Sequence, residues 1–311
     1  MQKGEAVRIF TGAMVPEQTS CVVMQEMVEL AGNEISINGE IKPGSNIRLR
    51  GANIHEGEMA LSKGTIINPA GIGYLASLGI SEMQVFRKPK AGVIVSGNEL
   101  VKSGQALQAG QIYEGNSIML ASALQSTGFG LEQLKVVKDD FNETVEAIQE
   151  MMAQCDVIML SGSISVGDYD FAGKALESLN VETIFYKVNQ KPGKPLFFGK
   201  KSNHLFFGLP GNPAASLACY YEYVLPALRK MSGINPVYLE KKLLPAKNGF
   251  AKSDERAHFL RARISGNTVV ILEKQDSAAL QSFALANALV YLPANKNEIE
   301  AGERVEVHRL P

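Results

Sequence analysis

Between Ala91 and about Met231 the chain alternates short apolar runs with segments of helical periodicity, and this alternation limits the fold more than any other feature. Short β-branched and aliphatic runs are typical of strands buried on both faces, whereas apolar residues three and four apart indicate helices. Strands that alternate with helices form βαβ units, so the pattern predicts an α/β domain with a parallel sheet and helices on both faces. The predicted strands are Ala91–Ser96, Leu134–Lys138, Val157–Leu160, Thr183–Tyr186 and Leu205–Phe207, and the predicted helices span 117–125, 143–152 and 214–231.

The regions on both sides of this segment are richer in short β-type runs. Before it, Gly, Asn and Pro pairs separate the runs as in hairpins, and a helix over 69–78 is closed by Gly79. After Gly233 the runs fit a small barrel or sandwich. The predicted flanking strands are Val7–Phe10, Cys21–Met24, Ile35–Ile37, Asn46–Leu49, His258–Ile264, Thr268–Leu272 and Arg304–His308. We expect a partial β-rich domain (1–57), a helical connecting segment (58–87), an α/β domain (88–232) and a C-terminal β-barrel-like domain (233–311).

Composition and charge exclude several classes of protein. The 311 residues carry a formal net charge of -1, which gives no reason to expect nucleic acid or an anionic membrane as a partner. No apolar run approaches the ~20 residues of a membrane-spanning helix. The three cysteines lie far apart, as expected for core residues of a cytoplasmic protein, and the four histidines lack zinc-site spacing.

The segment from Met159 to Asp170 carries the most specific local signal. A buried-strand run breaks at Ser161 into small residues that let backbone N–H groups approach a ligand, and Asp168 and Asp170 follow directly. This order indicates an anion or nucleotide held by backbone amides beside a site for a hard metal ion. The same residues also fit an ordinary strand-to-helix loop with a capping Asp, and the loop alone does not separate the two interpretations.

Polar residues follow four of the predicted strands at the point where each strand ends. Glu99, Asp139 and the acids of Asp168–Asp170 come after three of them, and the loop Gly208–Pro213 comes after the fourth. In a parallel sheet these ends share one edge, where ligands collect. Carboxylates within reach of one another repel unless a cation lies among them, and ligation by oxygen alone suits Mg²⁺.

The segment from Lys187 to Pro195 supplies the opposite charge. Lys187, Lys191 and Lys194 are stiffened by two prolines and a glycine. Fixed ammonium groups near a carboxylate–metal cluster indicate an anionic substrate such as a phosphate or oxyanion. A solvated basic loop is the alternative, and the position directly after a predicted core strand favours the site.

The loop Gly208–Pro213 opens the helix predicted over 214–231. Pro213 suits the first helical turn because it has no N–H to leave unpaired, and Asn212 can cap the helix. The turn then forms a helix N-terminus able to bind an anion, although the same residues also make an ordinary helix start.

Seven motifs follow one another along nearly the whole chain. They are Ile9–Pro16, Val23–Glu26, Ser96–Leu100, Gly110–Ser117, Ser161–Asp170, Lys191–Pro195 and Gly208–Pro213. Together they resemble the molybdopterin molybdenumtransferase (MoeA) family, which includes the E domain of gephyrin. The resemblance implies an enzyme that uses Mg²⁺ to insert molybdate into adenylyl-molybdopterin, releasing AMP and molybdenum cofactor. It also implies a central domain similar to MogA-type adenylyltransferases, which are an expected partner, and a homodimer in which residues 1–57 complete the neighbouring cleft.

Position by position, the same resemblance implies the site residues. The catalytic set is Glu99, Asp139, Asp170, Lys187 and Lys191. The implied metal ligands are Glu99, Asp139, Asp168 and Asp170, of which Asp170 is the more dependable member of the last pair. The residues expected to bind the pterin nucleotide are Thr11, Asn116, Ser117, Ser161, Gly162, Ser163, Ser165, Lys194, Pro210, Gly211, Asn212, Pro213 and Ser277.

The chain departs from the family pattern in three places. Family members usually begin with further helices and a segment resembling Asp-Gly-Tyr-Ala, so the sequence looks truncated before its β-rich domain. Asn53 stands where a carboxylate is usual, while Ser163 and Glu114 replace a usual Gly and Asp. A MogA-like adenylyltransferase and a non-catalytic pterin-binding scaffold are the alternatives, and the sequence does not separate molybdate from tungstate.

Overall fold

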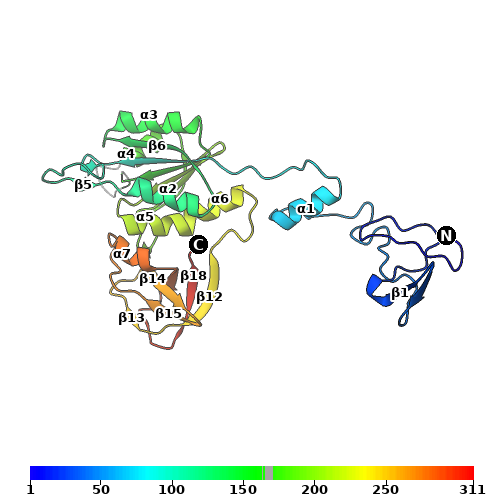
Figure 1. The fold of residues 1–311 in the computed structure, drawn as a ribbon. Helices are drawn as coiled ribbons and strands as arrows, with labels where there is room; N and C mark the ends of the chain where they lie inside the picture. The colour runs from blue at the N-terminus through cyan, green and yellow to red at the C-terminus, as the bar shows by residue number, and fades with distance from the viewer. Residues whose placement is uncertain (163, 165–170) are drawn as a thin grey trace. The chain divides into compact units, whose positions relative to one another are not determined.

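The computed structural model describes residues 1–162, 164 and 171–311, so the expected site residues Ser163, Ser165, Asp168 and Asp170 lie outside the described part. The chain divides into two compact units, Met1–Ser81 and Glu82–Pro311, whose helices and strands are labelled in Figure 1. Each unit is considered by itself. Among the described residues, no helix is both long enough and apolar enough to cross a bilayer.

The first unit contains one hairpin and one α-helix. After a 3-10 turn, Gln25–Met27, strand β1 (Val28–Ala31) pairs antiparallel with β2 (Glu34–Ile37) across the turn Gly32–Asn33. This hairpin confirms the predicted strand Ile35–Ile37 and its turn, and its two strands are the β-strands of the first unit.

Helix α1 (Pro69–Ser77) begins at the predicted residue and ends one residue before the predicted end. The Asn68 side chain accepts a hydrogen bond from the Gly71 N–H (2.8 Å), with Pro in the first turn. At the other end Gly79 has φ +78°, and its N–H and that of Ile80 donate to carbonyls of the last helical turn. This is a Schellman cap, and it requires a residue that tolerates positive φ.

Three predicted strands of the first unit do not form: Val7–Phe10, Cys21–Met24 and Asn46–Leu49. The Val22 N–H does donate to the Ser45 carbonyl (2.9 Å), but no ladder extends from this bond. Leu75 is the one buried side chain among residues 1–81, all of which the structure describes. Without a face to bury, the alternating runs have no packing to hold them in a ladder.

The second unit is built around a six-stranded sheet in the order β6-β3-β7-β11-β10-β8. The first four strands in this order run parallel, so their carboxyl ends share one edge, as predicted. Strand β10 is missing from the sequence prediction; it runs antiparallel to both β11 and β8, so the sheet is mixed and not wholly parallel. The strands are β3 (Ala91–Ser96), β6 (Leu131–Val137), β7 (Val157–Ser161), β8 (Glu182–Tyr186), β10 (Phe197–Lys201) and β11 (His204–Leu209).

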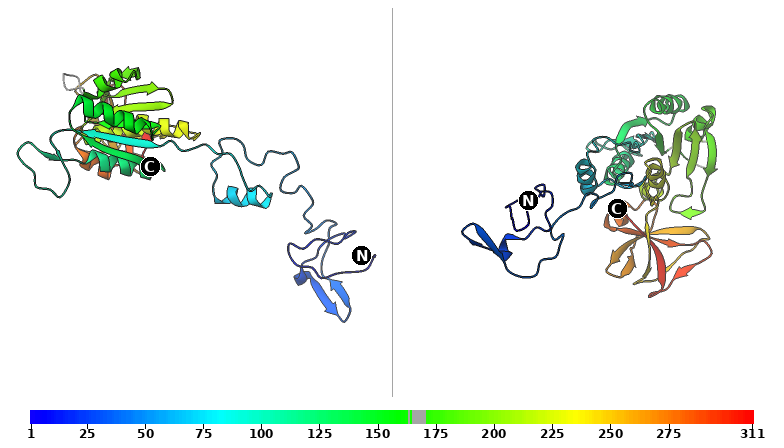
Figure 2. Two further views of the ribbon diagram at one scale, coloured as in Figure 1. Left: turned by 90° about the horizontal axis from the view of Figure 1, so that it is seen from above. Right: turned by 90° about the vertical axis from the view of Figure 1, so that its right-hand side faces the viewer.

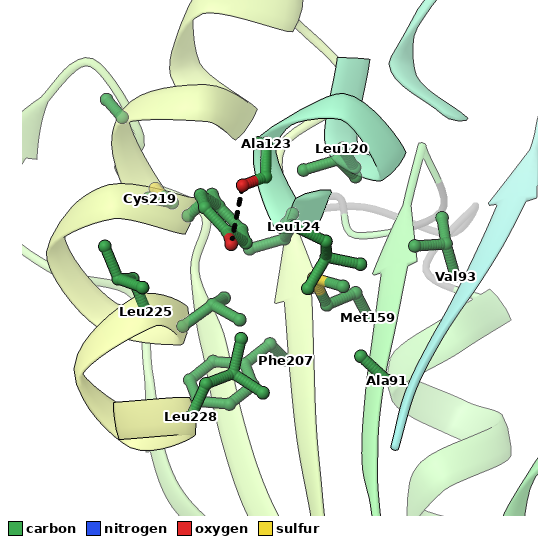
Figure 3. Close-up of a cluster of buried hydrophobic side chains, with 14 of the residues drawn as sticks. Ala91, Val93, Leu120, Ala123, Leu124, Met159, Phe207, Cys219, Leu225 and Leu228 are labelled. Carbon is green, nitrogen blue, oxygen red and sulfur yellow. Dashed lines mark hydrogen bonds between the residues drawn. The ribbon is translucent and has the colours of Figure 1, made fainter. Parts of the chain in front are cut away.

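Helices cover both faces of this sheet, as predicted (Figures 1 and 2). Successive strand residues point to opposite faces of the sheet and pack against different helices. Val93 and Met159 pack beneath one set of helices, and Ile94 and Ile158 pack beneath the other. Figure 3 shows the first of these layers. One set is α2 (Asn116–Ser126), α5 (Pro213–Cys219), η2 (Tyr220–Val224) and α6 (Leu225–Met231), and the other is α3 (Phe141–Met152) and α4 (Phe171–Ser178).

The helix predicted over 214–231 is continuous but contains a π turn, η2, at its middle. Pro226 follows this turn, and because proline lacks an N–H and its ring crowds the preceding turn, the wider π turn accommodates it. The Tyr220 hydroxyl lies 2.6 Å from Thr127 Oγ1 and donates to the Ala123 carbonyl (3.2 Å), the dashed line in Figure 3. These bonds tie the long helix to α2.

The C-terminal domain is a five-stranded antiparallel sheet in the order β12-β18-β16-β14-β15. A parallel bridge between Ala246 and Val269 brings the end of β12 beside β15, which rolls the sheet into the predicted barrel-like form. From the α/β domain, β9 (Gln190–Lys191) adds to β14 in parallel and so joins the two domains. The remaining elements are β12 (Glu240–Pro245), β13 (Phe250–Ala251), β14 (Ala257–Ser265), β15 (Thr268–Ile271), α7 (Leu280–Leu285), β16 (Ala288–Leu292), β17 (Glu298–Ile299) and β18 (Arg304–Arg309).

Candidate functional site

A cleft of about 670 Å³ lies between the carboxyl edge of the sheet and the C-terminal domain. Segments that follow β3, β7 and β11 line one side, and a short parallel pair, β4 (Leu100–Val101) with β5 (Ile112–Tyr113), flanks it. Ligands of open α/β sheets bind at this edge. The lining residues are Val95, Ser96, Glu99, Leu100, Ile112–Asn116, Gly162, Ile164, Lys191–Pro195, Pro210–Pro213, Arg256, Ser277 and Ala278.

The acidic side of the cleft carries Glu99 and Glu114. The Glu114 carboxylate accepts hydrogen bonds from the N–H (2.8 Å) and the hydroxyl (2.5 Å) of Ser117, so this predicted binding hydroxyl is engaged within the protein. Asp139 does not line the cleft. It exchanges two 3.3 Å hydrogen bonds with Asn98, which is the neighbour of Glu99, and so ties the ends of β3 and β6 together.

The basic side of the cleft is formed by Lys191, Lys194 and Arg256. Asp254 organises it: Arg256 donates to this carboxylate from Nε (3.1 Å) and Nη2 (2.9 Å), and Lys191 Nζ lies 3.7 Å away. Hydrogen bonding from Arg256 holds the pKa of Asp254 far below its usual range, although partial burial opposes this shift. Lys187 points elsewhere, with its ammonium 5.2 Å from the ring centroid of Tyr186.

Asn116 joins two of the predicted loops at the floor of the cleft. Its Nδ2 donates to Ser161 Oγ (3.0 Å) and to the Gly211 carbonyl (2.7 Å), which fixes the orientation of the amide. Its Oδ1 and the hydroxyl of Ser96 are buried and have no hydrogen-bond partner among the described residues. Since buried polar atoms are normally paired, these two indicate where a ligand would supply the missing partners.

The loop before α5 differs from the prediction in the role of the Asn212 side chain. Pro213 occupies the first helical position as expected, but the Asn212 side chain makes no capping bond. Its Nδ2 donates instead to Ser277 Oγ (2.9 Å), and the Ala215 N–H donates to the Ser277 carbonyl (3.2 Å). The competing partner lies in the C-terminal domain, so the expected cap becomes a bond between domains.

Three sequence models of known families match the chain. They are the "MoeA N-terminal region (domain I and II)" over residues 1–79, the "Probable molybdopterin binding domain" over 92–230 and the "MoeA C-terminal region (domain IV)" over 244–310. The molybdopterin molybdenumtransferase of Haemophilus influenzae is 34% identical over 309 residues, which are 97% of this chain and 76% of that protein. The chain belongs to the molybdopterin molybdenumtransferase family.

Other members of the family agree in extent and in fold. The molybdopterin molybdenumtransferase of a Nostoc species is 33% identical and matches 100% of this chain and 73% of its own length. The crystal structure of the molybdopterin biosynthesis MoeA protein of Pyrococcus horikoshii OT3 superposes with a TM-score of 0.79 at 27% identity, covering 99% of this chain and 76% of that one. The predicted family and fold class are therefore confirmed.

Among the lining residues of this molybdopterin molybdenumtransferase family member that sequence reasoning did not assign to the site are Arg256, Ser96 and Glu114. Arg256 belongs to a different domain from the lysines, and it directly precedes β14, whose pairing with β9 brings the two domains together beside the cleft. Ser96 and Glu114 lie within two of the seven motifs, but the site roles in those motifs were assigned to neighbouring residues. The predicted Thr11 is exposed in the first unit, and its role stays a prediction.

Proposed function

We propose that this chain inserts molybdate into adenylyl-molybdopterin and releases AMP in a Mg²⁺-dependent reaction. Membership of the family makes it a transferase of molybdenum cofactor biosynthesis. The observation that carries the finer proposal is that one cleft is lined both by Lys191, Lys194 and Arg256 and by Glu99 and Glu114. Such a site suits a substrate that is anionic at one end and approached by a cation at the other.

The basic side is proposed to hold molybdate, which is a tetrahedral dianion. The lysines supply compact point charges, and the Arg256 N–H groups that do not bond Asp254 supply further donors for oxyanion oxygens. Asp254 fixes the guanidinium before a ligand arrives, so little orientational freedom is lost on binding. These groups position the oxyanion against the bound pterin and need form no covalent intermediate.

The floor of the cleft is proposed to hold the heterocycle of the pterin nucleotide. Val95, Leu100 and Ile164 offer apolar surface, which suits a planar ring. The free Oδ1 of Asn116 can only accept a hydrogen bond, and the Ser96 hydroxyl can donate or accept one. A ring edge that bears an N–H group satisfies both atoms.

Magnesium is proposed at the acidic side, where the donors are carboxylate oxygens. Glu99 and Asp139 stand at neighbouring strand ends and would contribute two ligands, and Asp168 and Asp170 are the proposed remainder. Within the described residues no three acidic, His or Cys side chains gather to complete such a site. When bound, Mg²⁺ would neutralise charge on the phosphate of the departing AMP. Glu99, which lines the cleft, and Asp139, which does not, would hold this ion at the ends of β3 and β6.

Assembly and location complete the proposal. A homodimer would let the first unit bury its apolar side chains, and Thr11 is proposed to reach the neighbouring subunit's cleft. A MogA-type adenylyltransferase is the proposed supplier of the adenylylated substrate. All three cysteines are free thiols, which fits the reducing cytoplasm that we propose as the location.

Product analysis tests the proposed function. Wild-type protein with adenylyl-molybdopterin should release AMP only when both molybdate and Mg²⁺ are present, and EDTA should stop the release. Release of pyrophosphate from ATP and molybdopterin would instead indicate the adenylyltransferase. If neither AMP nor pyrophosphate is released, the non-catalytic pterin-binding scaffold is the remaining interpretation.

The variant Asp170→Asn should lose most of the Mg²⁺-dependent AMP release while the protein remains folded. Wild-type turnover in that variant would exclude Asp170 from the proposed metal ligands.

A further inference from the structure

The loop Lys191–Pro195 brings two ammonium groups to the cleft, and one buried amide holds it from behind. Gln190, which precedes the loop, has a side chain only 2% exposed. Its Nε2 donates to the carbonyl of Pro192 at 3.1 Å, between the two lysines. Pro192 has no N–H of its own, so its carbonyl is the polar backbone group by which this residue is held. The Lys194 carbonyl is held separately, by the Val188 N–H at 2.9 Å.

The other end of the same amide is fixed by the long helix. Gln190 Oε1 accepts a hydrogen bond from the hydroxyl of Tyr223, which lies on η2. Burial raises the pKa of the Tyr223 phenol well above its ordinary value, so the hydroxyl keeps its proton. With Tyr223 as donor and the Pro192 carbonyl as acceptor, only one orientation of the amide satisfies both bonds.

The loop packs closely against the side chains behind it at Gly193. Gly193 has φ +94°, and a Cβ at this position would lie 2.5 Å from Cys219 Sγ and 3.0 Å from Gln190 Nε2. Cys219 itself is fully buried. The loop therefore rests directly on Gln190 and Cys219, and a shift of either would move the backbone that carries Lys191 and Lys194.

A buried glutamine is not what stability alone would select here. A methionine of similar length could fill the same space without burying an amide, which costs free energy unless every polar atom is paired. Here both ends of the amide are paired, one to the lysine loop and one to a helix of the core. This arrangement specifies the position of the loop, and that suits a site whose charges must be preorganised.

We propose that Gln190 and Tyr223 form a positioning pair that sets the direction of the Lys191 and Lys194 ammonium groups toward the bound oxyanion. The pair touches no substrate, and it acts through the Pro192 carbonyl. This inference rests on the proposed function, because it takes molybdate as the oxyanion. Misplacement of charge by about 1 Å can lower the productivity of a site by orders of magnitude, so a single lost hydrogen bond has a measurable effect.

The test uses the full chain with Tyr223→Phe and Gln190→Met. Each should raise the molybdate concentration that gives half-maximal AMP release about tenfold or more, with a much smaller change in the maximal rate. Tyr220→Phe is the matched control: it removes a buried hydroxyl bond from the same helix, on the side facing Thr127, and should leave the molybdate dependence unchanged. A loss of thermal stability alone, equal in Tyr223→Phe and Tyr220→Phe, would overturn the pairing.

The double variant provides a second criterion. If the two residues act as one unit, Gln190→Met with Tyr223→Phe should bind molybdate no more weakly than Gln190→Met alone. Independent, additive effects would contradict the pair. Should Gln190→Met fail to fold, Tyr223→Phe decides the matter alone.

Calorimetric titration with molybdate separates this inference from the proposed function. Weaker binding by the variants supports the pair even if the wild type releases no AMP, whereas equal binding in a wild type that does release AMP overturns the pair only.

Discussion

At the scale of single residues, the close approach of two loops depends on Gly162. Its φ is +106°, and a Cβ there would lie 2.1 Å from the carbonyl oxygen of Ser96. Gly162→Ala should therefore lower the free energy of unfolding by about 2 kcal/mol or more and displace the cleft-lining loop. Gly211 lies next to Gly162, but a Cβ on it would meet its nearest atom, Gly162 Cα, only at 3.5 Å, so Gly211→Ala is the matched control.

Urea unfolding of both variants makes the comparison. We expect a lower midpoint for Gly162→Ala and one close to wild type for Gly211→Ala. Equal midpoints for the two would mean that the loop relaxes around the added methyl group and that the glycine has no steric role.

The residues of the cleft show what sequence can and cannot predict at this scale. Lys191 and Lys194 lie in the segment after β8, and Pro210 directly follows β11; the ends of both strands can be predicted from apolar runs. Arg256 could not be placed that way, since its position depends on strand pairing between two domains. Asn212 has the right residue type for a cap, but the sequence gives no sign that Ser277 competes for its side chain.

At the scale of elements, a strand is hard to predict from its own sequence when packing against a neighbouring element determines whether it forms. Strand β10 lacks alternation and ends in Lys200–Lys201, yet it forms because the turn Ser202–Asn203 places it beside the buried β11. The runs Val7–Phe10 and Asn46–Leu49 have better β character and form no strand, since nothing covers a face of them. Burial supplied by the neighbouring element therefore outweighs local propensity.

A histidine links the long helix to the C-terminal sheet and should make this contact sensitive to pH. His308 on β18 is 4% exposed, with Nδ1 2.8 Å from Glu222 on η2 and Nε2 2.8 Å from Glu306, which also bonds Lys241. Burial lowers the pKa of His308, but the two carboxylates together outweigh burial and raise it above its ordinary value.

Because the folded-state pKa is raised, the contribution of His308 to stability is complete below its unfolded pKa of about 6.5 and is lost as pH rises through the folded value. The wild-type melting temperature should therefore fall between pH 6 and pH 9 by more than that of His308→Gln. The charged groups facing the ring are Glu222, Glu306 and Lys241. The control is His204→Gln, because His204 contacts none of these three groups and lies in a different part of the chain. Identical pH profiles for wild type and His308→Gln would contradict this role.

At the scale of the whole molecule, the two units differ in how much they bury. Residues 82–311 contain continuous apolar cores on both faces of the α/β sheet and inside the C-terminal barrel. The first unit has one buried side chain, Leu75, while Phe10, Met14 and Leu30 are among its exposed apolar residues. A segment of this kind gains stability mainly by packing on another surface.

This imbalance predicts a dimer. Light scattering at micromolar concentration should give a mass of about twice the 33.6 kDa of one chain. Removal of residues 1–81 should lower the mass to that of a single truncated chain, because the exposed apolar surface of the first unit would no longer be present. A mass of one chain for the intact protein would refute dimerisation.

The central claim is that molybdate reacts in the cleft between the α/β domain and the C-terminal barrel, and Arg256 tests it most directly. Arg256→Gln removes a cation from that cleft and should raise the molybdate concentration for half-maximal AMP release roughly tenfold or more. Arg263→Gln removes an exposed arginine from β14, the strand that begins directly after Arg256, and should change nothing. An unchanged molybdate dependence in Arg256→Gln, with AMP still released, would place the oxyanion outside this cleft and contradict the assignment.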